Sequence, residues 1–255
     1  MTRRAGTAKT AATPAAAQSR SGKKSPTVSK AISPAPAAPR RARGAVPAAV
    51  PATTAAAALP QGGGEVRIIG GQWKRTRLPV ARLAGLRPTP DRVRETLFNW
   101  LGQDLNGWRC LDAFAGTGAL GLEAASRGAA RVLLVEQDAG LVAQLHALCQ
   151  RLEASAVTVR RGDGIAQLRQ CAPGSLDIAF IDPPFEDSAL FAPALKAAAA
   201  ALAPQGFVYL EAASAWSDDE LVPLGLALHR HLRAGAVHAH LLRLADAAAQ
   251  PVAPP

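Results

Sequence analysis

Aromatic residues, cysteines and long apolar runs are scarce in this chain of 255 residues. Only 4% of it is aromatic although 49% is hydrophobic, so a core can form and must consist mainly of Ala, Leu and Val. Cys110, Cys149 and Cys171 lack CxxC spacing and are too few for a disulfide framework, which suits a reducing compartment. The longest apolar stretches, such as 197–203, are far shorter than the roughly 20 residues of a membrane-spanning helix. We therefore expect a soluble, cytoplasmic protein that does not associate with a membrane.

Acidic residues are absent from residues 1–64, which hold ten Lys or Arg. Residues 65–255 carry nineteen charges of each sign, so the whole net charge of +10 lies in this N-terminal tail. The tail has no hydrophobic period, which predicts disorder and a salt-sensitive attraction to polyanions. Its composition also matches an organellar transit peptide, although prolines from Pro14 onward would interrupt the helix that such signals use. No charged stretch leads into an unbroken apolar one, so we expect no secretion signal.

One folded domain is predicted from residue 65 to residue 246, followed by a disordered end over 247–255. We expect order to begin near Glu65, after a flexible glycine run at 62–64. From residue 108 onward, strand-like and helix-like segments alternate, which is typical of an α/β fold with parallel strands and crossover helices. The predicted strands are 108–114, 131–136, 156–160, 176–182 and 206–211, and the predicted helices are 117–127, 138–152, 164–171 and 188–203.

Hairpins are predicted at both ends of this alternating core. The N-terminal one occupies 65–86, and the C-terminal one should close the sheet with two antiparallel strands. The N-terminal hairpin is predicted to consist of Val66–Ile69 and Trp73–Val80 with a turn at Gly70-Gly71. A helix capped by Asp91 or Thr89 should follow it and run to about Leu101. The C-terminal hairpin is predicted to consist of 226–233 and 236–244 with a tight turn at Ala234-Gly235.

The loop after the first core strand, Asp112-Ala-Phe-Ala-Gly-Thr-Gly-Ala-Leu-Gly121, contains a GxGxxG spacing. Glu136 follows Gly116 by twenty residues at the end of the next strand, where an acid commonly binds a ribose diol. Asp112, however, ends the first strand where a dinucleotide would place its pyrophosphate, and a carboxylate repels phosphate. A cofactor with a cationic head fits better, and S-adenosylmethionine offers an ammonium and a sulfonium. The alternative is that the glycines only form a tight strand-to-helix turn.

Asp163 follows the third core strand in Arg161-Gly-Asp-Gly164. The carboxyl ends of strands are where open α/β sheets bind ligands, so its carboxylate is a candidate acceptor for an adenine amine. A helix N-cap is the alternative role, and the two roles do not conflict.

The segment Ile178-Ala-Phe-Ile-Asp-Pro-Pro-Phe185 is the most specific feature of the chain. Prolines lack an N–H group and restrict the backbone, so the carbonyls of Asp182 and Pro183 and the Asp182 carboxylate are expected to form an acceptor-only pocket. Such acceptors favour a pyramidal exocyclic amine whose lone pair can attack a methyl group in line. Phe185 offers a face on which an unstacked base can lie. An ordinary proline-rich loop is the alternative.

At this point the chain resembles a known family. Asp182-Pro-Pro-Phe185 matches the signature of amino-group methyltransferases that act on nucleic acids. Arg67-Ile-Ile-Gly-Gly71, Arg87 to Asn99 and Asp112 to Glu123 are similar to the RsmD-type enzymes, over about 65–244.

This resemblance implies a seven-stranded, Rossmann-like class I methyltransferase. It also implies methylation of N2 of a guanine in 16S ribosomal RNA, with S-adenosylmethionine as the cofactor. The residues implied for the cofactor are Asp112, Phe114, Ala115, Gly116, Gly118, Glu136, Asp163 and Gly164, and those implied for the target base are Asp182, Pro183, Pro184 and Phe185.

A basic stretch between residues 65 and 94 is the candidate RNA surface. It holds eight Lys or Arg against Glu65 and Asp91, and an interleaved tryptophan can stack on a base. A solvated basic face without a ligand is the alternative. The candidate contacts are Arg67, Trp73, Lys74, Arg75, Arg87 and Arg92.

Four histidines, His229, His231, His238 and His240, form two HxH pairs on the last two predicted strands. A zinc site would also need Cys or carboxylate ligands nearby, so we expect no metal and place the histidines on one face of the closing hairpin.

Three functions remain open from the sequence. The first is a methyltransferase for a base amine, acting as a monomer on ribosomal RNA within a small-subunit particle. The second is a catalytically inactive RNA-binding or assembly protein on the same fold, and the third is a methyltransferase for adenine N6 in DNA or RNA. The intact Asp182 to Phe185 segment favours the first over the second.

Overall fold

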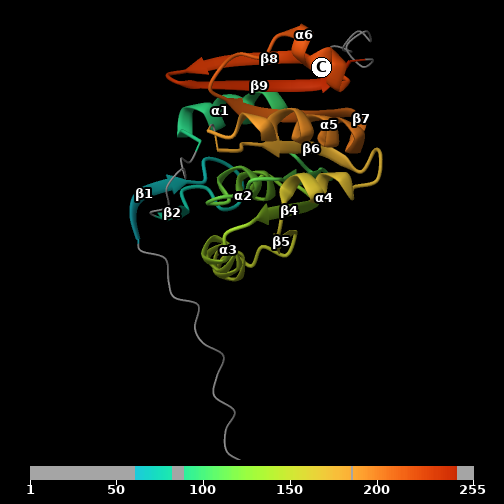
Figure 1. Ribbon diagram of the computed structural model, residues 1–255. Coiled ribbons are helices and arrows are strands. Elements are labelled where there is room, and N and C mark those ends of the chain that lie inside the picture. Colours follow the sequence, from blue (N-terminus) through green and yellow to red (C-terminus); the bar gives the residue numbers. More distant parts are fainter. Residues whose placement is uncertain (1–60, 82–88, 185, 246–255) are drawn as a thin grey trace, which may run out of the picture. The chain divides into compact units, whose positions relative to one another are not determined.

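The computed structural model describes residues 61–81, 89–184 and 186–245, which form an α/β unit (Figure 1). Predictions for the tail before residue 61, for Arg82, Arg87 and Phe185, and for 247–255 lie outside the described residues. The elements are β1 Gln61–Arg67, β2 Arg77–Ala81, α1 Asp91–Leu101, β3 Arg109–Asp112, α2 Ala119–Ser126, β4 Arg131–Glu136, α3 Ala139–Arg151, β5 Val157–Arg161, α4 Gly164–Arg169, β6 Leu176–Ile181, η1 Ser188–Leu190, α5 Phe191–Ala201, β7 Leu202–Ala212, α6 Asp218–Leu221, η2 Val222–Leu224, β8 Leu226–Ala234 and β9 Val237–Leu244.

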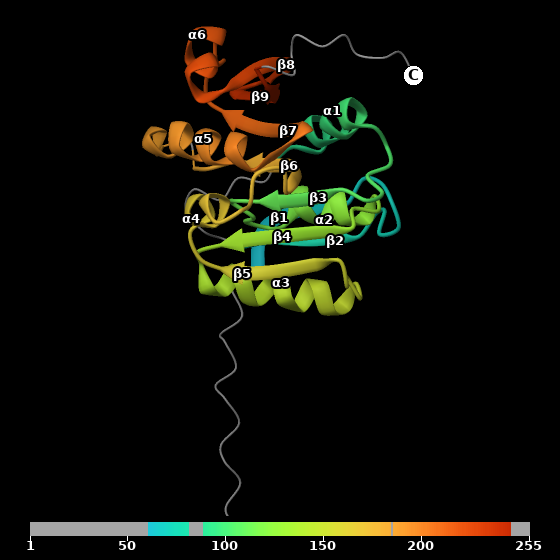
Figure 2. The ribbon, with the colours of Figure 1, turned by 90° about the vertical axis from the view of Figure 1, so that its right-hand side faces the viewer.

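A seven-stranded sheet in the order β5-β4-β3-β6-β7-β9-β8 forms the centre of the unit. Figure 2 shows its strands stacked from β8 at the top to β5 at the bottom. The strands β3 to β7 are parallel, whereas β9 runs antiparallel to both β7 and β8. The predicted mostly parallel sheet with an antiparallel C-terminal hairpin is thus confirmed. The strand order reverses between β3 and β6, which is where open α/β sheets bind ligands.

Helices cover both faces of this sheet, and each face buries its own apolar cluster. One cluster combines the β1–β2 hairpin, α1, α2 and α3, and includes the fully buried Phe98, Phe180 and Tyr209. The other combines α4, α5 and α6 with the opposite face of the central strands. Its helix α5 is rich in alanine, so the helix packs closely on β6 and β7. Among the described residues no helix is long and apolar enough to cross a membrane.

The N-terminal hairpin differs from the prediction in both its strands and its turn. β1 begins at Gln61, so the glycine run lies within a strand, which carries a bulge before Glu65. β1 ends at Arg67 and β2 begins at Arg77. The connecting segment is held by backbone hydrogen bonds of Ile68 with Thr76 and Arg75. Gly70 and Gly71 do not form a two-residue turn. A Cβ on Gly71 would lie 1.8 Å from the carbonyl oxygen of Ser126, so this glycine is needed for close approach to α2.

Three further boundaries differ from the sequence-based expectation. Pro90 is the N-cap of α1 and neither Thr89 nor Asp91 caps it, because the Asp91 carboxylate pairs with arginines instead. The predicted helix 188–203 is divided into η1 and α5, and β7 begins at Leu202 because Pro204 disfavours further helix. The last hairpin turns at Gly235 and Ala236, since Ala234 already pairs with Val237.

Candidate active site

A cavity of about 880 Å³ opens at the carboxyl ends of the central strands. Its walls come mainly from the carboxyl ends of β3, β4 and β7, from the loops after β3, β4 and β6 and from the segment that enters α1. Seven lining residues are acidic, and none of the described residues that line it is Lys, Arg or His. The acids are Asp112, Glu136, Asp138, Asp182, Glu186, Asp187 and Glu211. The cavity therefore favours a cationic or hydrogen-bond-donating ligand over a phosphate.

Asp112 lies at the floor of this cavity and is 1% exposed. Its Oδ2 accepts from the backbone N–H of Gly121 at 3.1 Å, whereas its Oδ1 has no hydrogen-bond partner among the described residues. Burial raises the pKa of this carboxyl to about 7. A buried acceptor without a donor is costly, so Asp112 is suited to a ligand that brings one.

The glycine loop brings α2 close to the sheet. Gly118 is the N-cap of α2 and adopts φ +80°, a conformation that L side chains rarely adopt. A Cβ on Gly121 would lie 2.2 Å from the Leu134 side chain on β4, so a larger residue here would require that side chain to move. The loop residues Phe114, Ala115 and Gly116 line the cavity.

Glu136 ends β4 and is half-buried at the cavity wall. Its Oε2 accepts from the backbone N–H of Gly116 at 2.9 Å. Its Oε1 accepts from the backbone N–H groups of Gln137 and Asp138 at 2.7 and 2.9 Å. The carboxylate therefore joins the glycine loop to the start of α3, and its remaining lone pairs are available to hydroxyl donors.

Asp163 and Gly164 are not among the residues that line the cavity. The exposed Asp163 is the N-cap of α4, where its Oδ1 accepts from the backbone N–H groups of Ile165 and Ala166. A Cβ on Gly164 would lie 1.9 Å from the carbonyl oxygen of Ala113, so this glycine lets α4 approach the glycine loop. Both residues thus support the loop, and contact of Asp163 with an adenine remains a prediction.

Asp182 follows β6 and lines the cavity together with Pro183 and Pro184. Thr89 donates from Oγ1 to Oδ2 of Asp182 at 3.5 Å. Burial, together with the neighbouring Glu211 and Asp112, raises the pKa of Asp182 well above its ordinary value. The acid and the two prolines are brought to the same cavity as the glycine loop, while Phe185 lies outside the described residues.

Glu211 and Thr89 are cavity residues that the sequence reasoning missed. Glu211 lies near the end of β7, is 2% exposed and accepts from the Tyr209 hydroxyl at 2.8 Å. Burial raises its pKa, although the Thr89 and Tyr209 hydroxyls and the charge of Arg94 act against this rise. A single acid in the apolar segment Phe207 to Ala212 was the available signal, since a buried carboxyl group needs a structural or functional partner.

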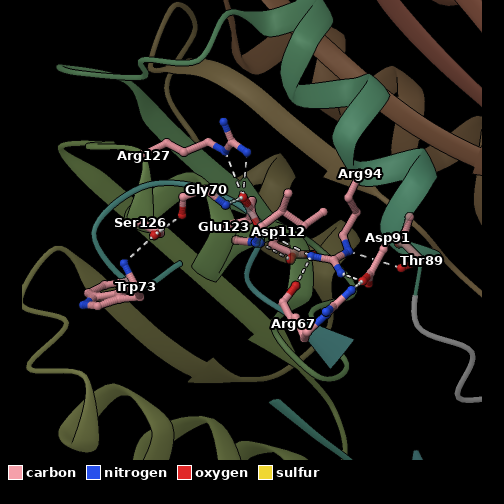
Figure 3. A network of polar contacts seen from close by, with 12 residues as sticks. Arg67, Gly70, Trp73, Thr89, Asp91, Arg94, Asp112, Glu123, Ser126 and Arg127 are labelled. Carbon is pink, nitrogen blue, oxygen red and sulfur yellow. Dashed lines mark hydrogen bonds and ion pairs between the residues drawn. The ribbon is translucent and has the colours of Figure 1, made fainter. Parts of the chain in front are cut away.

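A second charge cluster lies beside the cavity, around Glu123 of α2 (Figure 3). Its Oε1 accepts from Arg127 at 2.9 Å and from the backbone N–H of Gly70 at 2.7 Å. Its Oε2 accepts from Arg94 at 3.3 Å and from the backbone N–H of Ile69 at 2.7 Å. Glu123 therefore joins α1 and α2 to the N-terminal hairpin.

Arg94 is fully buried in this cluster, so it does not belong to an RNA-facing surface as the sequence suggested. It pairs with Asp91 at 2.6 Å and donates to the carbonyl oxygens of Arg67 and Thr89. Burial lowers its pKa, although Glu123 and Asp91 oppose this effect. The physical reason is its place on the apolar face of α1, together with Leu97.

The other candidate RNA contacts that are described lie outside the cavity lining. Arg67 is exposed and pairs with Asp91 at 3.1 Å, and Lys74, Arg75 and Arg92 are exposed as well. Trp73 is half-buried, packs against the core and donates its backbone N–H to the Ser126 hydroxyl. These residues could therefore contact an RNA only outside the cavity.

Three histidines of the closing hairpin, His231, His238 and His240, pack on one another, whereas His229 packs on Phe207. The ring centroids of His231 and His240 lie 4.8 Å apart, and those of His231 and His238 lie 5.2 Å apart. Burial lowers the pKa of His240 to about 4, and its Nε2 accepts from the backbone N–H of Trp216. Among the described residues, no group of three or more His, Cys, Asp or Glu is arranged to hold a metal.

The chain is similar to methyltransferases of known sequence and structure. A family model described as Conserved hypothetical protein 95 matches residues 66–243. Ribosomal RNA small subunit methyltransferase D of Escherichia coli is 42% identical over 177 residues, which cover 69% of this chain and 88% of that protein. The protein of the same name from Haemophilus influenzae is 45% identical over 129 residues, which cover 49% of this chain and 67% of that protein.

A solved structure described as a putative methyltransferase from Escherichia coli is 40% identical, with a TM-score of 0.61. The match covers 71% of this chain and 98% of that chain. The prediction of a Rossmann-like class I methyltransferase fold is confirmed by this likeness and by the strand order.

Proposed function

The chain belongs to the RsmD-type methyltransferase family, and we propose that it transfers a methyl group from S-adenosylmethionine to the exocyclic N2 amine of a guanine in small-subunit (16S) ribosomal RNA. The observation that carries this proposal is the unpaired Oδ1 of Asp112 in a cavity that also holds Asp182 and two prolines. One part of the cavity suits a cationic cofactor, and the other suits a base amine.

The residues present fit S-adenosylmethionine. Asp112 offers a buried acceptor without a donor, which an ammonium group would satisfy, and Glu136 at the end of β4 is placed to accept from ribose hydroxyls. When bound, the cofactor supplies a methyl group activated by a sulfonium. The absence of cations from the described lining supports this group over a pyrophosphate-containing dinucleotide.

The target amine is proposed to lie against Asp182 and the carbonyl oxygens of Asp182 and Pro183. Two acceptors can take both N–H bonds of an exocyclic amine, and this leaves its lone pair directed at the methyl group. The described lining offers Leu190 and Val237 as apolar neighbours, and we propose that Phe185 adds a stacking surface for the base.

The RNA itself is proposed to lie across the exposed basic residues of the N-terminal hairpin and α1, namely Arg67, Lys74, Arg75 and Arg92, with Arg87 and the partly buried Trp73. The ten Lys or Arg of residues 1–64 are proposed to add a salt-sensitive attraction to the phosphates. We further propose that the protein acts as a cytoplasmic monomer on a small-subunit particle.

Mass spectrometry of ribosomal RNA nucleosides tests the function. The full chain is incubated with labelled cofactor and with 16S RNA, either naked or in small-subunit particles from cells that lack the enzyme. Labelled N2-methylguanosine is expected, and the Asp182→Ala variant is the control. Labelled N6-methyladenosine would instead identify an adenine enzyme. RNA binding without any label on either substrate would mean that the protein acts without catalysis.

A further inference from the structure

Three carboxyl groups lie at the ends of three adjacent parallel strands. Asp112 of β3 pairs in register with Phe180 of β6, and Phe180 pairs with Tyr209 of β7. Two residues further along their chains, Asp182 and Glu211 therefore occupy neighbouring positions on the same face of the sheet. Proposed cofactor and base contacts account for Asp112 and Asp182, but they give no role to Glu211.

The hydroxyl of Thr89 connects Asp182 with Glu211. Its single proton can be donated to Oδ2 of Asp182, at 3.5 Å, or to Glu211, with which it also forms a hydrogen bond. Thr89 is 3% exposed, so the hydroxyl is held in this place by its surroundings. A hydroxyl can accept a proton from one group while it donates its own proton to another.

We propose that Asp182, Thr89 and Glu211 form a proton relay that removes the proton released by the methylated amine. This proposal rests on the proposed function of the same cavity. Glu211 is the terminal acceptor, Asp182 touches the amine, and Thr89 positions the two carboxyl groups and passes the proton between them.

The step balances in atoms and charge. The amine lone pair forms the N–C bond, and the electron pair of the broken C–S bond stays with sulfur. The nitrogen is then cationic and must release one proton, which Asp182 accepts. Asp182 passes a proton to the Thr89 oxygen, whose own proton moves to Glu211. Asp182 is again a carboxylate and Glu211 is a neutral acid that can lose its proton to water after product release.

The surroundings make this pair a better proton acceptor than an isolated carboxylate. Asp182 and Glu211 line the same cavity at neighbouring positions of the sheet, Asp112 adds a third acid, and burial raises the pKa of both carboxyls of the pair. The Tyr209 hydroxyl and the charge of Arg94 act in the opposite direction on the pKa of Glu211. Repulsion between two buried carboxylates favours uptake of the first proton, as in other carboxyl pairs.

Glu211→Gln tests the terminal acceptor because glutamine keeps the shape and still accepts from Tyr209. The rate of methyl transfer is measured across pH in single turnover, with saturating cofactor and RNA. The wild-type rate is expected to fall at acidic pH as the pair becomes protonated. In the variant the plateau is expected to fall at least tenfold, within the range of general-base contributions. The acidic limb should also move to lower pH by about one unit or more, because Asp182 has lost a like charge.

Thr89→Val tests the connection, and Thr89→Ser is its matched variant. Valine keeps the volume but removes the hydroxyl, so the plateau is expected to fall, whereas serine should restore most of the lost rate. Equal rates for the valine and serine variants would overturn the relay.

Carbon-13 NMR titration of labelled carboxyl groups in the full chain, without cofactor or RNA, gives a readout independent of activity. Asp182 is expected to titrate at lower pH in Glu211→Gln than in the wild type. An Asp182 titration that is the same in Glu211→Gln as in the wild type would overturn the relay. So would the same pH profile of methyl transfer in both proteins, given a wild type that methylates RNA. A wild type that methylates no RNA would reject the proposed function, while the titration would still report on the carboxyl pair.

Discussion

Two clusters of buried charge lie on the same side of the sheet, and they differ in how completely their charges are matched. Glu123 accepts from two arginines and two backbone N–H groups, so both of its oxygens are satisfied. The cluster of Asp112, Asp182 and Glu211 has no cationic side chain in the described cavity lining, and Oδ1 of Asp112 lacks a donor among the described residues. The matched cluster holds the hairpin to the core, whereas the unmatched one is available to a ligand.

Breaking the matched cluster should have the largest effect. Glu123→Gln leaves Arg94 and Arg127 without their buried counter-charge, so the free energy of unfolding is expected to fall by roughly 3 to 5 kcal/mol. Chemical denaturation measures this change, and Glu95→Gln on the exposed side of α1 is the matched control. A loss as small as that of the control would mean that the Glu123 contacts are not the anchor of the hairpin.

Asp112→Asn should act on stability in the opposite direction. A carboxyl whose folded-state pKa is raised to about 7 contributes stability at acidic pH, which is lost as pH rises through 7. The variant lacks this loss, so its stability relative to the wild type should increase between about pH 4 and pH 8. The gain should reach up to about 4 kcal/mol, since each unit of raised pKa corresponds to about 1.4 kcal/mol.

Thermal unfolding of both proteins across pH measures this difference. Cofactor affinity should fall in the same variant, because the neutral amide no longer attracts an ammonium. A constant stability difference between the two proteins across this pH range would show that Asp112 titrates normally.

Asp182→Ala should reduce methyl transfer by on the order of a hundredfold or more, as for other single preorganised groups, while cofactor affinity stays nearly intact. Turnover with labelled cofactor and calorimetry with unlabelled cofactor measure the two quantities separately. Asp219→Ala, on the exposed helix α6, is the control. Wild-type turnover in Asp182→Ala would reject its assigned role.

Glu136→Ala sharpens the comparison because Glu136 lies at the cavity and still has both oxygens bonded to the backbone. If it also binds the ribose, cofactor affinity should weaken by roughly 1 to 3 kcal/mol. Calorimetry measures this loss, with Glu95→Ala as the control. An unchanged affinity would place Glu136 with the structural cluster.

The regular core could be predicted from the sequence because its periodicity is local. The strand 131–136 was predicted with its observed bounds, and the parallel strands with crossover helices followed from the alternation of segments. The N-terminal hairpin was placed incorrectly because its glycines serve contact with Ser126, which lies more than fifty residues away.

Counting the charges of a segment also gives a wrong prediction where a charged side chain is buried. Arg94 was counted as part of a basic surface, although its spacing from Phe98 and Leu101 places it on the apolar face of α1. That helical spacing was visible in the sequence. The approach of Thr89 to Asp182, across ninety-three residues, was not visible, because it depends on how α1 packs on the sheet.

The contacts of Glu123 also bear on how this protein folds during synthesis. The hairpin is synthesised before α2. The backbone N–H groups of Gly70 and Ile69 therefore lack their acceptor until Glu123, 53 or 54 residues later in the chain, has been added. At about 5 to 20 residues per second, this delay lasts roughly 3 to 10 seconds. During that time the apolar side chains of Val66, Ile68, Leu78 and Val80 lack the helix that later covers them. The nascent hairpin is therefore a predicted point of chaperone contact.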